Sequence, residues 1–215
     1  MEGNFMKWEQ VPLGPLQTNS YIVTEGSHCL VIDPGDEGKK LIQLLEKRKV
    51  VPQAILLTHA HFDHIGAVDI IRDHYRVPVY IHKKEENWLG DPSLNGSKFF
   101  MMPVSTSVKP ANSFFQKEEI ITIGDFTFSV FETPGHSPGS VSFYFEEAEF
   151  VISGDALFHQ SIGRTDLPGG NHDQLLKSIH SKLLVLPEQT LVLPGHGYTT
   201  TIGDEMDSNP FLNGF

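Results

Sequence analysis

Residue types that commonly bind metal ions are concentrated in the segment 58–64, which reads Thr-His-Ala-His-Phe-Asp-His. Four of these seven side chains, those of His59, His61, Asp63 and His64, are imidazoles or carboxylates. This donor set suits a borderline divalent cation such as zinc, and a set without thiolate is typical of catalytic rather than purely structural sites. The segment therefore predicts an open, catalytic metal centre.

Every candidate ligand follows an apolar stretch that predicts a β-strand. Residues 54–57, Ala-Ile-Leu-Leu, directly precede the histidine-rich segment. The same order of apolar strand, small flexible residue and ligand recurs three times, at His136, Asp155 and His196. If these strand ends meet at one edge of the packed sheets, five histidines and two aspartates face one another.

The elements that must position these residues follow from the hydrophobic pattern. Strands are predicted on either side of a turn at 25–27, at 77–81 and within 119–152, and helices at 38–49, 65–75 and 173–185. This order predicts an α/β fold with two facing β-sheets and helices outside. No linker, repeat or low-complexity tract interrupts the chain, so we expect one domain over 1–215.

An apolar run, Phe-Phe-Met-Met at 99–102, lies in the loop-rich segment 83–116. As part of the core, it would cap the end of the sheets. As part of a site, it would form one wall of a substrate mouth, because soft methionine and aromatic surfaces accept varied acyl groups.

Composition excludes several classes of partner. The 215 residues contain 16 basic and 27 acidic side chains, a net charge of −11, and no concentrated basic face, so we expect no binding to nucleic acid. Neither an export signal nor an 18-residue apolar stretch occurs, so we expect no membrane association. The single cysteine, Cys29, cannot form an internal disulfide, which fits a cytoplasmic location. The oligomeric state is left open.

The chain resembles the metallo-β-lactamase-fold hydrolases, and within them the small glyoxalase II-like (hydroxyacylglutathione hydrolase-like) proteins. The resemblance rests on residues 14–21, 32–35 and 209–211, and on the segment 58–64 followed in order by the three later ligands. It implies a four-layer αββα sandwich of two mixed sheets and two divalent ions, zinc first, with iron or manganese as alternatives. The implied ligands are His59, His61 and His136 for one ion, Asp63, His64 and His196 for the other, and Asp155 for both.

The resemblance also implies hydrolysis of a small-molecule thioester by a hydroxide that bridges the two ions. Two nearby divalent ions lower the pKa of a shared water towards neutrality. A thiolate leaving group has a pKa of about 8.5 and needs little help from a general acid. Asp63 is the candidate to orient the hydroxide or accept its proton. An outer carboxylate such as Asp33 is expected to bind the second ring nitrogen of a ligand histidine.

Substrate recognition is where the chain departs from the full-length glyoxalase II enzymes. Only about 19 residues follow His196, so we expect the C-terminal region that holds glutathione in those enzymes to be missing. Arg164 could clamp a substrate carboxylate or pair with Asp166. His159 could line the pocket without binding metal. A cysteine at the position of Asp155 would be expected of the true β-lactamases, so antibiotic hydrolysis is disfavoured.

A different reaction is possible on the same fold. The segments 154–157 and 163–166 are similar to those of the persulfide dioxygenases, which use one iron held by two histidines and one aspartate. In that alternative His59, His136 and Asp155 would form the facial triad and leave positions open for oxygen.

Overall fold

The structure of the protein is a computed structural model that describes residues 6–100 and 106–212. The chain divides into two compact units, one made of residues 1–115 and 122–127 and the other of residues 116–121 and 128–215. Each unit contains one large sheet and its own helices, and each is described by itself below. The single domain expected over 1–215 stays a prediction.

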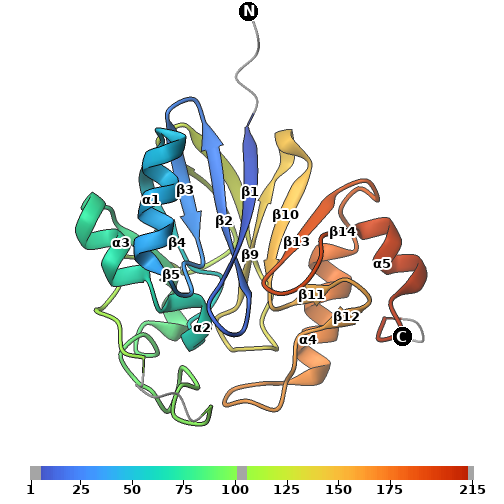
Figure 1. The fold of residues 1–215 in the computed structure, drawn as a ribbon. Coiled ribbons are helices and arrows are strands. Elements are labelled where there is room, and N and C mark those ends of the chain that lie inside the picture. Colours follow the sequence, from blue (N-terminus) through green and yellow to red (C-terminus); the bar gives the residue numbers. More distant parts are fainter. Residues whose placement is uncertain (1–5, 101–105, 213–215) are drawn as a thin grey trace, which may run out of the picture. The chain divides into compact units, whose positions relative to one another are not determined.

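The first unit is built on a mixed sheet of six strands in the order β1-β2-β3-β4-β5-β6 (Figure 1). Strands β1 to β3 are antiparallel, whereas β3 to β6 are parallel. The strands are β1 (Lys7–Leu13), β2 (Thr18–Glu25), β3 (His28–Ile32), β4 (Val51–Leu56), β5 (Val79–His82) and β6 (Ser113–Phe115). Because the carboxyl ends of parallel strands meet at one edge of a sheet, the residues that follow β3 and β4 are neighbours.

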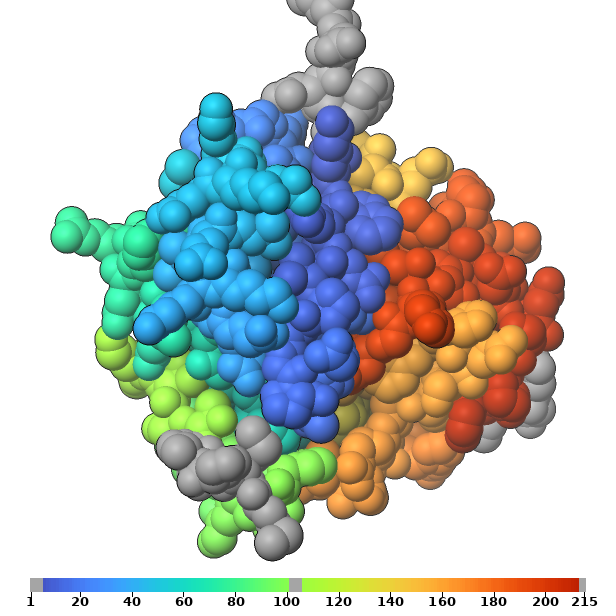
Figure 2. All heavy atoms as spheres, in the orientation of Figure 1, coloured from blue at the N-terminus to red at the C-terminus, as the bar shows by residue number. Residues whose placement is uncertain are grey.

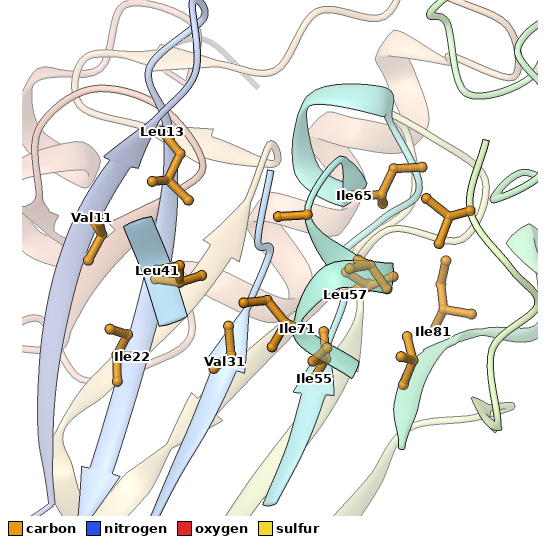
Figure 3. Close-up of a cluster of buried hydrophobic side chains, with 14 of the residues drawn as sticks. Val11, Leu13, Ile22, Val31, Leu41, Ile55, Leu57, Ile65, Ile71 and Ile81 are labelled. Carbon is orange, nitrogen blue, oxygen red and sulfur yellow. The ribbon is translucent and has the colours of Figure 1, made fainter. Parts of the chain in front are cut away.

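Two amphipathic helices of this unit, α1 (Gly38–Arg48) and α3 (Val68–Tyr75), pack on the sheet. Figure 3 shows Leu41 of α1 and Ile71 of α3 among strand residues such as Val31 and Ile55. The charged face of α1 forms part of the surface in Figure 2, in light blue. A short helix, α2 (Phe62–Ile65), and the 3₁₀ turn η1 (Lys83–Glu85) lie beside the strand ends. The apolar faces of α1 and α3 therefore fix the strands that carry the ligand loop.

Another mixed sheet of six strands, in the order β14-β13-β10-β9-β8-β7, belongs to the second unit apart from residues 122–127. Strand β10 is parallel to β13 and antiparallel to β9. The strands are β7 (Glu119–Ile123), β8 (Phe126–Glu132), β9 (Val141–Phe145), β10 (Phe150–Gly154), β13 (Leu191–Pro194) and β14 (Thr200–Thr201). A small separate hairpin consists of β11 (Leu157–Phe158) and β12 (Ser161–Ile162).

The helices of the second unit are α4 (His172–Ser178), which continues as a π-helical turn η3 (Ile179–Leu183), and α5 (Ile202–Ser208). The 3₁₀ turn η2 (Glu146–Ala148) joins β9 to β10. Leu175, Ile179 and Leu183 pack with Val151 and Val192 in the core of this unit. The side chain of Asn171 caps α4 by accepting a hydrogen bond from the backbone of Gln174, 3.0 Å away.

These elements confirm the α/β class with two mixed sheets and helices. The sequence pattern did not predict β1, β6 or α5, which bury few side chains each. In the run 99–102, Phe99 and Phe100 are 56% and 36% exposed, and Met101 and Met102 lie outside the described residues. Of the helices that the structure describes, none combines the length and the apolar character needed to span a bilayer.

Candidate metal centre

Three histidines of the first unit are buried against one another in the loop after β4. His59 and His64 are 0% exposed and His61 is 4% exposed. The ring centroid of His59 lies 4.7 Å from that of His61 and 4.2 Å from that of His64. Three protonated imidazoles could not share such a small buried volume at tolerable cost, whereas three neutral ones present lone pairs to a cation. The donor chemistry of this loop therefore fits a divalent metal ion.

Asp33, which follows β3, sets the orientation of this loop. Its side chain accepts hydrogen bonds from the backbone N and the hydroxyl of Thr58, at 2.8 and 2.6 Å. The same carboxylate lies 3.0 Å from Nδ1 of His64, and because a carboxylate only accepts, Nδ1 carries the proton. His64 is thereby left with Nε2 as its ligand atom, as expected for an outer carboxylate that holds a metal-binding histidine.

The same network orients His59 through Thr58. The Thr58 hydroxyl donates to Asp33, so its oxygen accepts from Nδ1 of His59, 3.0 Å away. His59, like His64, is then left with Nε2 as its ligand atom. Asp33, His59 and His64 each offer a ligand-type atom within 4.8 Å of the others. Because both oxygens of Asp33 accept hydrogen bonds, we assign Asp33 to positioning rather than to metal binding.

Replacing Asp33 by asparagine is expected to weaken metal binding about 10- to 100-fold, because the amide cannot hold both Thr58 and His64 as the carboxylate does. Asparagine suits the left-handed backbone of this residue, whose φ is 47°, so the change tests chemistry more than conformation. A titration of the metal-loaded protein against a chelator measures the affinity. Asp73→Asn is the control, since Asp73 is exposed and forms a surface ion pair with Lys109. An unchanged affinity in Asp33→Asn would contradict this role.

Asp63 lies in the first turn of α2 and is only 14% exposed at its side chain. Its Oδ2 accepts a hydrogen bond of 2.8 Å from the hydroxyl of Thr18 and lies 3.6 Å from Nε2 of His64. The backbone behind it is closely packed, because a Cβ on Gly35 would lie 1.8 Å from the carbonyl oxygen of Asp63. The position of Asp63 is therefore fixed both by its side chain and by its backbone.

Buried polar residues of the loop-rich segment hold the other side of the ligand loop. Glu85, 0% exposed, accepts a 2.7 Å hydrogen bond from the backbone N of Ala60. The carbonyl oxygen of Asn95, also fully buried, accepts from the backbone N of Phe62 at 3.0 Å. Reasoning from the sequence missed both positioning residues. The nearest apolar residues that follow Glu85 in the sequence, Trp88 and Leu89, lie three and four positions after it.

The second unit brings together the three later candidates. Nε2 of His136 and Nε2 of His196 lie 3.5 and 3.6 Å from the same oxygen, Oδ2 of Asp155. These distances are longer than a good hydrogen bond. They are close to the roughly 3.3 Å that separates two ligand atoms at tetrahedral zinc with bonds of about 2.0–2.1 Å. The arrangement therefore fits a carboxylate and two imidazoles that bind metal.

The orientation of His136 is set by a backbone carbonyl. The carbonyl oxygen of Arg164 lies 2.7 Å from Nδ1 of His136, and because a carbonyl only accepts, Nδ1 carries the proton. Nε2 is then directed to Asp155. Between these residues, a Cβ on Gly163 would lie 1.8 Å from the carbonyl oxygen of Asp155 and 3.3 Å from Cβ of His136. Only glycine fits there without displacing the chain.

A buried glutamate of α5 holds the hairpin that joins Asp155 to Arg164. Glu205 is 0% exposed and accepts hydrogen bonds from the backbone of Gln160, the hydroxyl of Thr200 and the amide of Asn209, at 2.9, 2.6 and 2.7 Å. The amide of Asn209 also donates to the carbonyl oxygen of Ser161, 3.1 Å away. These contacts fix the turn and the second strand of the β11–β12 hairpin.

The two residues predicted to contact substrate have protein partners in the structure. Arg164 donates from Nε and Nη2 to the two oxygens of Asp166, both at 2.7 Å, and this hydrogen bonding lowers the pKa of Asp166 to about 2. This is the ion pair that the sequence offered as an alternative to substrate binding. His159 is 45% exposed and its Nδ1 lies 3.5 Å from the carboxylate of Glu205. Substrate contact by either residue stays a prediction.

The predicted ligands therefore fall into two local sets. His59, His61, Asp63 and His64 gather in the first unit, and His136, Asp155 and His196 gather in the second. Each set follows the strand ends that the sequence indicated. Their use as one seven-residue centre stays a prediction.

A family model described as the metallo-beta-lactamase superfamily matches residues 13–196. The chain therefore belongs to the metallo-β-lactamase superfamily and is a metallo-hydrolase by family. It is 53% identical over 210 residues to the probable metallo-hydrolase YqgX of Bacillus subtilis, covering 98% of this chain and 99% of that protein. It is 36% identical over 209 residues to the hydroxyacylglutathione hydrolase GloC of Haemophilus influenzae, covering 97% and 99%.

Solved structures with the same fold extend this similarity. The BLEG-1 B3 metallo-β-lactamase has a TM-score of 0.95 and 56% identity, covering 97% of this chain and 100% of that one. TTHA1623 in a di-iron-bound form has a TM-score of 0.83 and 42% identity, covering 95% and 100%. ETHE1 from Myxococcus xanthus has a TM-score of 0.76 and 27% identity, covering 95% and 84%. The metallo-β-lactamase fold expected from the sequence is confirmed.

Proposed function

We propose that this metallo-hydrolase cleaves small-molecule thioesters, with hydroxyacyl thioesters as the first candidates, and that two divalent ions serve the reaction. The oriented Nε2 atoms of His59, His64 and His136 support metal binding, since their Nδ1 atoms are held by Thr58, Asp33 and Arg164, respectively. The name of GloC, which matches nearly the full length of both chains, supports the thioester as substrate. The proposed ligand set is His59, His61 and His136 for one ion, Asp63, His64 and His196 for the other, with Asp155 shared.

Bound metal would supply a hydroxide nucleophile near neutral pH and would polarise the substrate carbonyl. Asp63, which accepts a hydrogen bond from Thr18, would orient that nucleophile and take up its proton. The departing thiolate needs no dedicated acid, because its pKa is about 8.5. His59, His61 and His64 are all buried. Under this proposal, thioester cleavage needs no separate general acid.

The thiol carrier and the metal belong to the same proposal. Arg164 is engaged by Asp166, so recognition of a glutathione carboxylate by its guanidinium would require that ion pair to open. Thiol carriers other than glutathione are therefore also candidates. Zinc suits the histidine and carboxylate donors, and iron is the alternative that the di-iron form of TTHA1623 supports. We also propose a cytoplasmic setting without nucleic-acid partners, in keeping with the net charge of −11.

The test combines metal analysis with substrate screening on one preparation. Elemental analysis should give about two ions per chain, and 2-hydroxyacyl thioesters on several thiol carriers should be hydrolysed, as followed by the loss of thioester absorbance. Oxygen consumption with a thiol persulfide should be absent. The proposal fails if metal-loaded protein consumes oxygen with persulfide and leaves every thioester intact.

β-Lactam hydrolysis is the second candidate activity. The chain is 56% identical to BLEG-1, which is named a B3 metallo-β-lactamase, although Asp155 occupies the position where a cysteine was expected of β-lactamases. The similarity to BLEG-1 supports this activity, and the missing cysteine argues against it. A chromogenic cephalosporin belongs in the same screen, and turnover at rates comparable to the best thioester would favour this candidate.

Persulfide oxidation has narrower support. ETHE1 from Myxococcus xanthus is 27% identical to this chain. The remaining support for persulfide oxidation is the sequence similarity at 163–166. In this chain the carboxylate of Asp63 lies 3.6 Å from Nε2 of the buried His64, and the two could hold a further ion, which a single-iron site would not need. A content of one iron per chain together with oxygen uptake would favour the oxygenase.

A further inference from the structure

A pocket of about 290 Å³ opens beside Asp63 in the first unit. Its apolar walls come from Leu13, Leu16, Phe62 and Val108, and Asp63 forms part of its lining. This volume lies near the lower limit for ligand pockets, so it suits a small group rather than a whole cofactor. A candidate ligand and proton acceptor in the wall of a partly apolar pocket is the arrangement expected where a reacting group enters.

Two parts of the pocket lining are held by close backbone contacts. The turn at its mouth is closed by hydrogen bonds from the backbone N and the side-chain amide of Gln17 to the carbonyl oxygen of Gly14, at 3.2 and 2.7 Å. On the opposite side, a Cβ on Gly66 would lie 2.3 Å from the carbonyl oxygen of Gly35. Such close backbone contacts leave little room for the walls to move. The pocket can therefore select by shape and charge.

The charged residues that line the pocket are all acidic. Among the described residues that line it there are three aspartates, Asp36, Asp63 and Asp69, and no lysine, arginine or histidine. The charge of Asp69 is balanced by Arg72, whose Nε lies 2.9 Å from Oδ1 of Asp69. If Asp63 shares its charge with a bound ion, Asp36 still presents a carboxylate at the mouth. A second carboxylate on a ligand would therefore meet like charge in a partly desolvated space.

We propose that this pocket receives the acyl group of the substrate and selects short, uncharged acyl chains over chains that end in a carboxylate. This inference rests on the proposed thioester hydrolysis and adds the class of acyl group. The apolar walls would contact the acyl chain, Asp63 would face the reacting carbonyl, and the acidic lining would reject dicarboxylic acyl groups.

A matched pair of substrates tests the selection. Butyryl and succinyl thioesters of N-acetylcysteamine have the same number of acyl carbons and differ in their last group, a methyl or a carboxylate. We expect kcat/KM to be at least tenfold higher for the butyryl thioester. Equal values for the two substrates would overturn the proposal.

A charge placed on the wall gives a sharper test. Ser107 lines the pocket and is exposed, so Ser107→Arg adds a cation there. The ratio of kcat/KM between the two substrates should fall at least fivefold. Ser181→Arg is the matched control, because Ser181 is an exposed serine of η3 that also donates to a carbonyl oxygen and does not line the pocket. It should leave the ratio unchanged, and an equal change in both variants would overturn the proposal.

Binding without turnover separates this inference from the proposed function. Two thioethers of N-acetylcysteamine, S-butyl and S-(3-carboxypropyl), cannot be hydrolysed, and calorimetry measures their dissociation constants. We expect at least tenfold weaker binding of the carboxylate analogue and a smaller difference in Ser107→Arg. If no thioester is hydrolysed but this difference is found, the hydrolase proposal fails and the pocket selectivity stands. If thioesters are hydrolysed without any selectivity, the hydrolase proposal stands and the pocket selectivity fails.

Discussion

Replacing His61 by alanine is expected to lower kcat/KM for a thioester at least about 1000-fold, which corresponds to about 4 kcal/mol of transition-state stabilisation. The reason is the loss of one imidazole from a small buried donor set, since a missing ligand changes both the affinity and the geometry of a metal site. The metal content measured on the same sample should also fall below that of the unchanged protein.

The fold of the His61→Ala variant should survive. His61 is the residue before α2, and its side chain makes no capping hydrogen bond to that helix. His74→Ala is the matched control, because His74 is 45% exposed on α3 and its ring lies 3.7 Å from Glu46. The control should keep its activity within about twofold. A His61→Ala variant with full metal content and more than a tenth of the original activity would exclude His61 as a ligand.

Replacing Gly35 by alanine is expected to destabilise the protein by about 3 kcal/mol or more. The added methyl would lie 1.8 Å from the carbonyl oxygen of Asp63, and the colliding atom belongs to the backbone, so no side-chain rotation relieves the clash. For a chain of this size the melting temperature should fall by roughly 6–12 °C. Because Asp63 must move, metal affinity should fall as well.

Gly90→Ala provides the comparison for this change. A Cβ at Gly90 would have the carbonyl oxygen of Val108 at 3.7 Å as its nearest neighbour, which is ordinary contact. Its effect on stability should stay within about 1 kcal/mol. Thermal unfolding and chelator titration of both variants measure the two quantities. Equal melting temperatures for Gly35→Ala and Gly90→Ala would show that the loop at Asp63 can move aside.

The positions of the candidate ligands could be predicted because they depend on local patterns. An apolar strand followed by a small residue and a ligand places His59, His136, Asp155 and His196 at strand ends whatever the rest of the chain does. Leu41 and Ile71 were found in the same way, because helical spacing reveals which side chains enter the core. These signals need no knowledge of distant contacts.

The missed elements lack such patterns. Strand β1 buries only Val11 and Leu13 of its seven residues and contains a proline, so no clear alternation marks it. Helix α5 buries Ile202 and Glu205 and depends on a cap, in which the side chain of Thr201 accepts from the backbone of Asp204 at 3.1 Å. In a sequence, Glu205 is indistinguishable from a surface glutamate. Its role follows only from residues that lie elsewhere in the chain.

Arg164 illustrates a different difficulty. Its guanidinium could serve a substrate or Asp166, and residue types alone cannot decide between two carboxylates. The structure adds a role that no side-chain pattern could reveal, since it is the backbone carbonyl of Arg164 that orients His136. A substitution of Arg164 should therefore leave this hydrogen bond in place. The side chain and the backbone of this residue can be tested separately.

The contacts of Glu205 limit how far the chain can be shortened from its C-terminal end. The family match ends at residue 196, and a chain cut there would still contain every candidate ligand. It would lack Glu205 and Asn209, which hold Gln160 and Ser161 in the hairpin between Asp155 and Arg164. Such a fragment would have the right residues on an unsupported hairpin. Libraries of truncated or circularly permuted variants should therefore retain residues 197–209 even though these residues bring no ligand of their own.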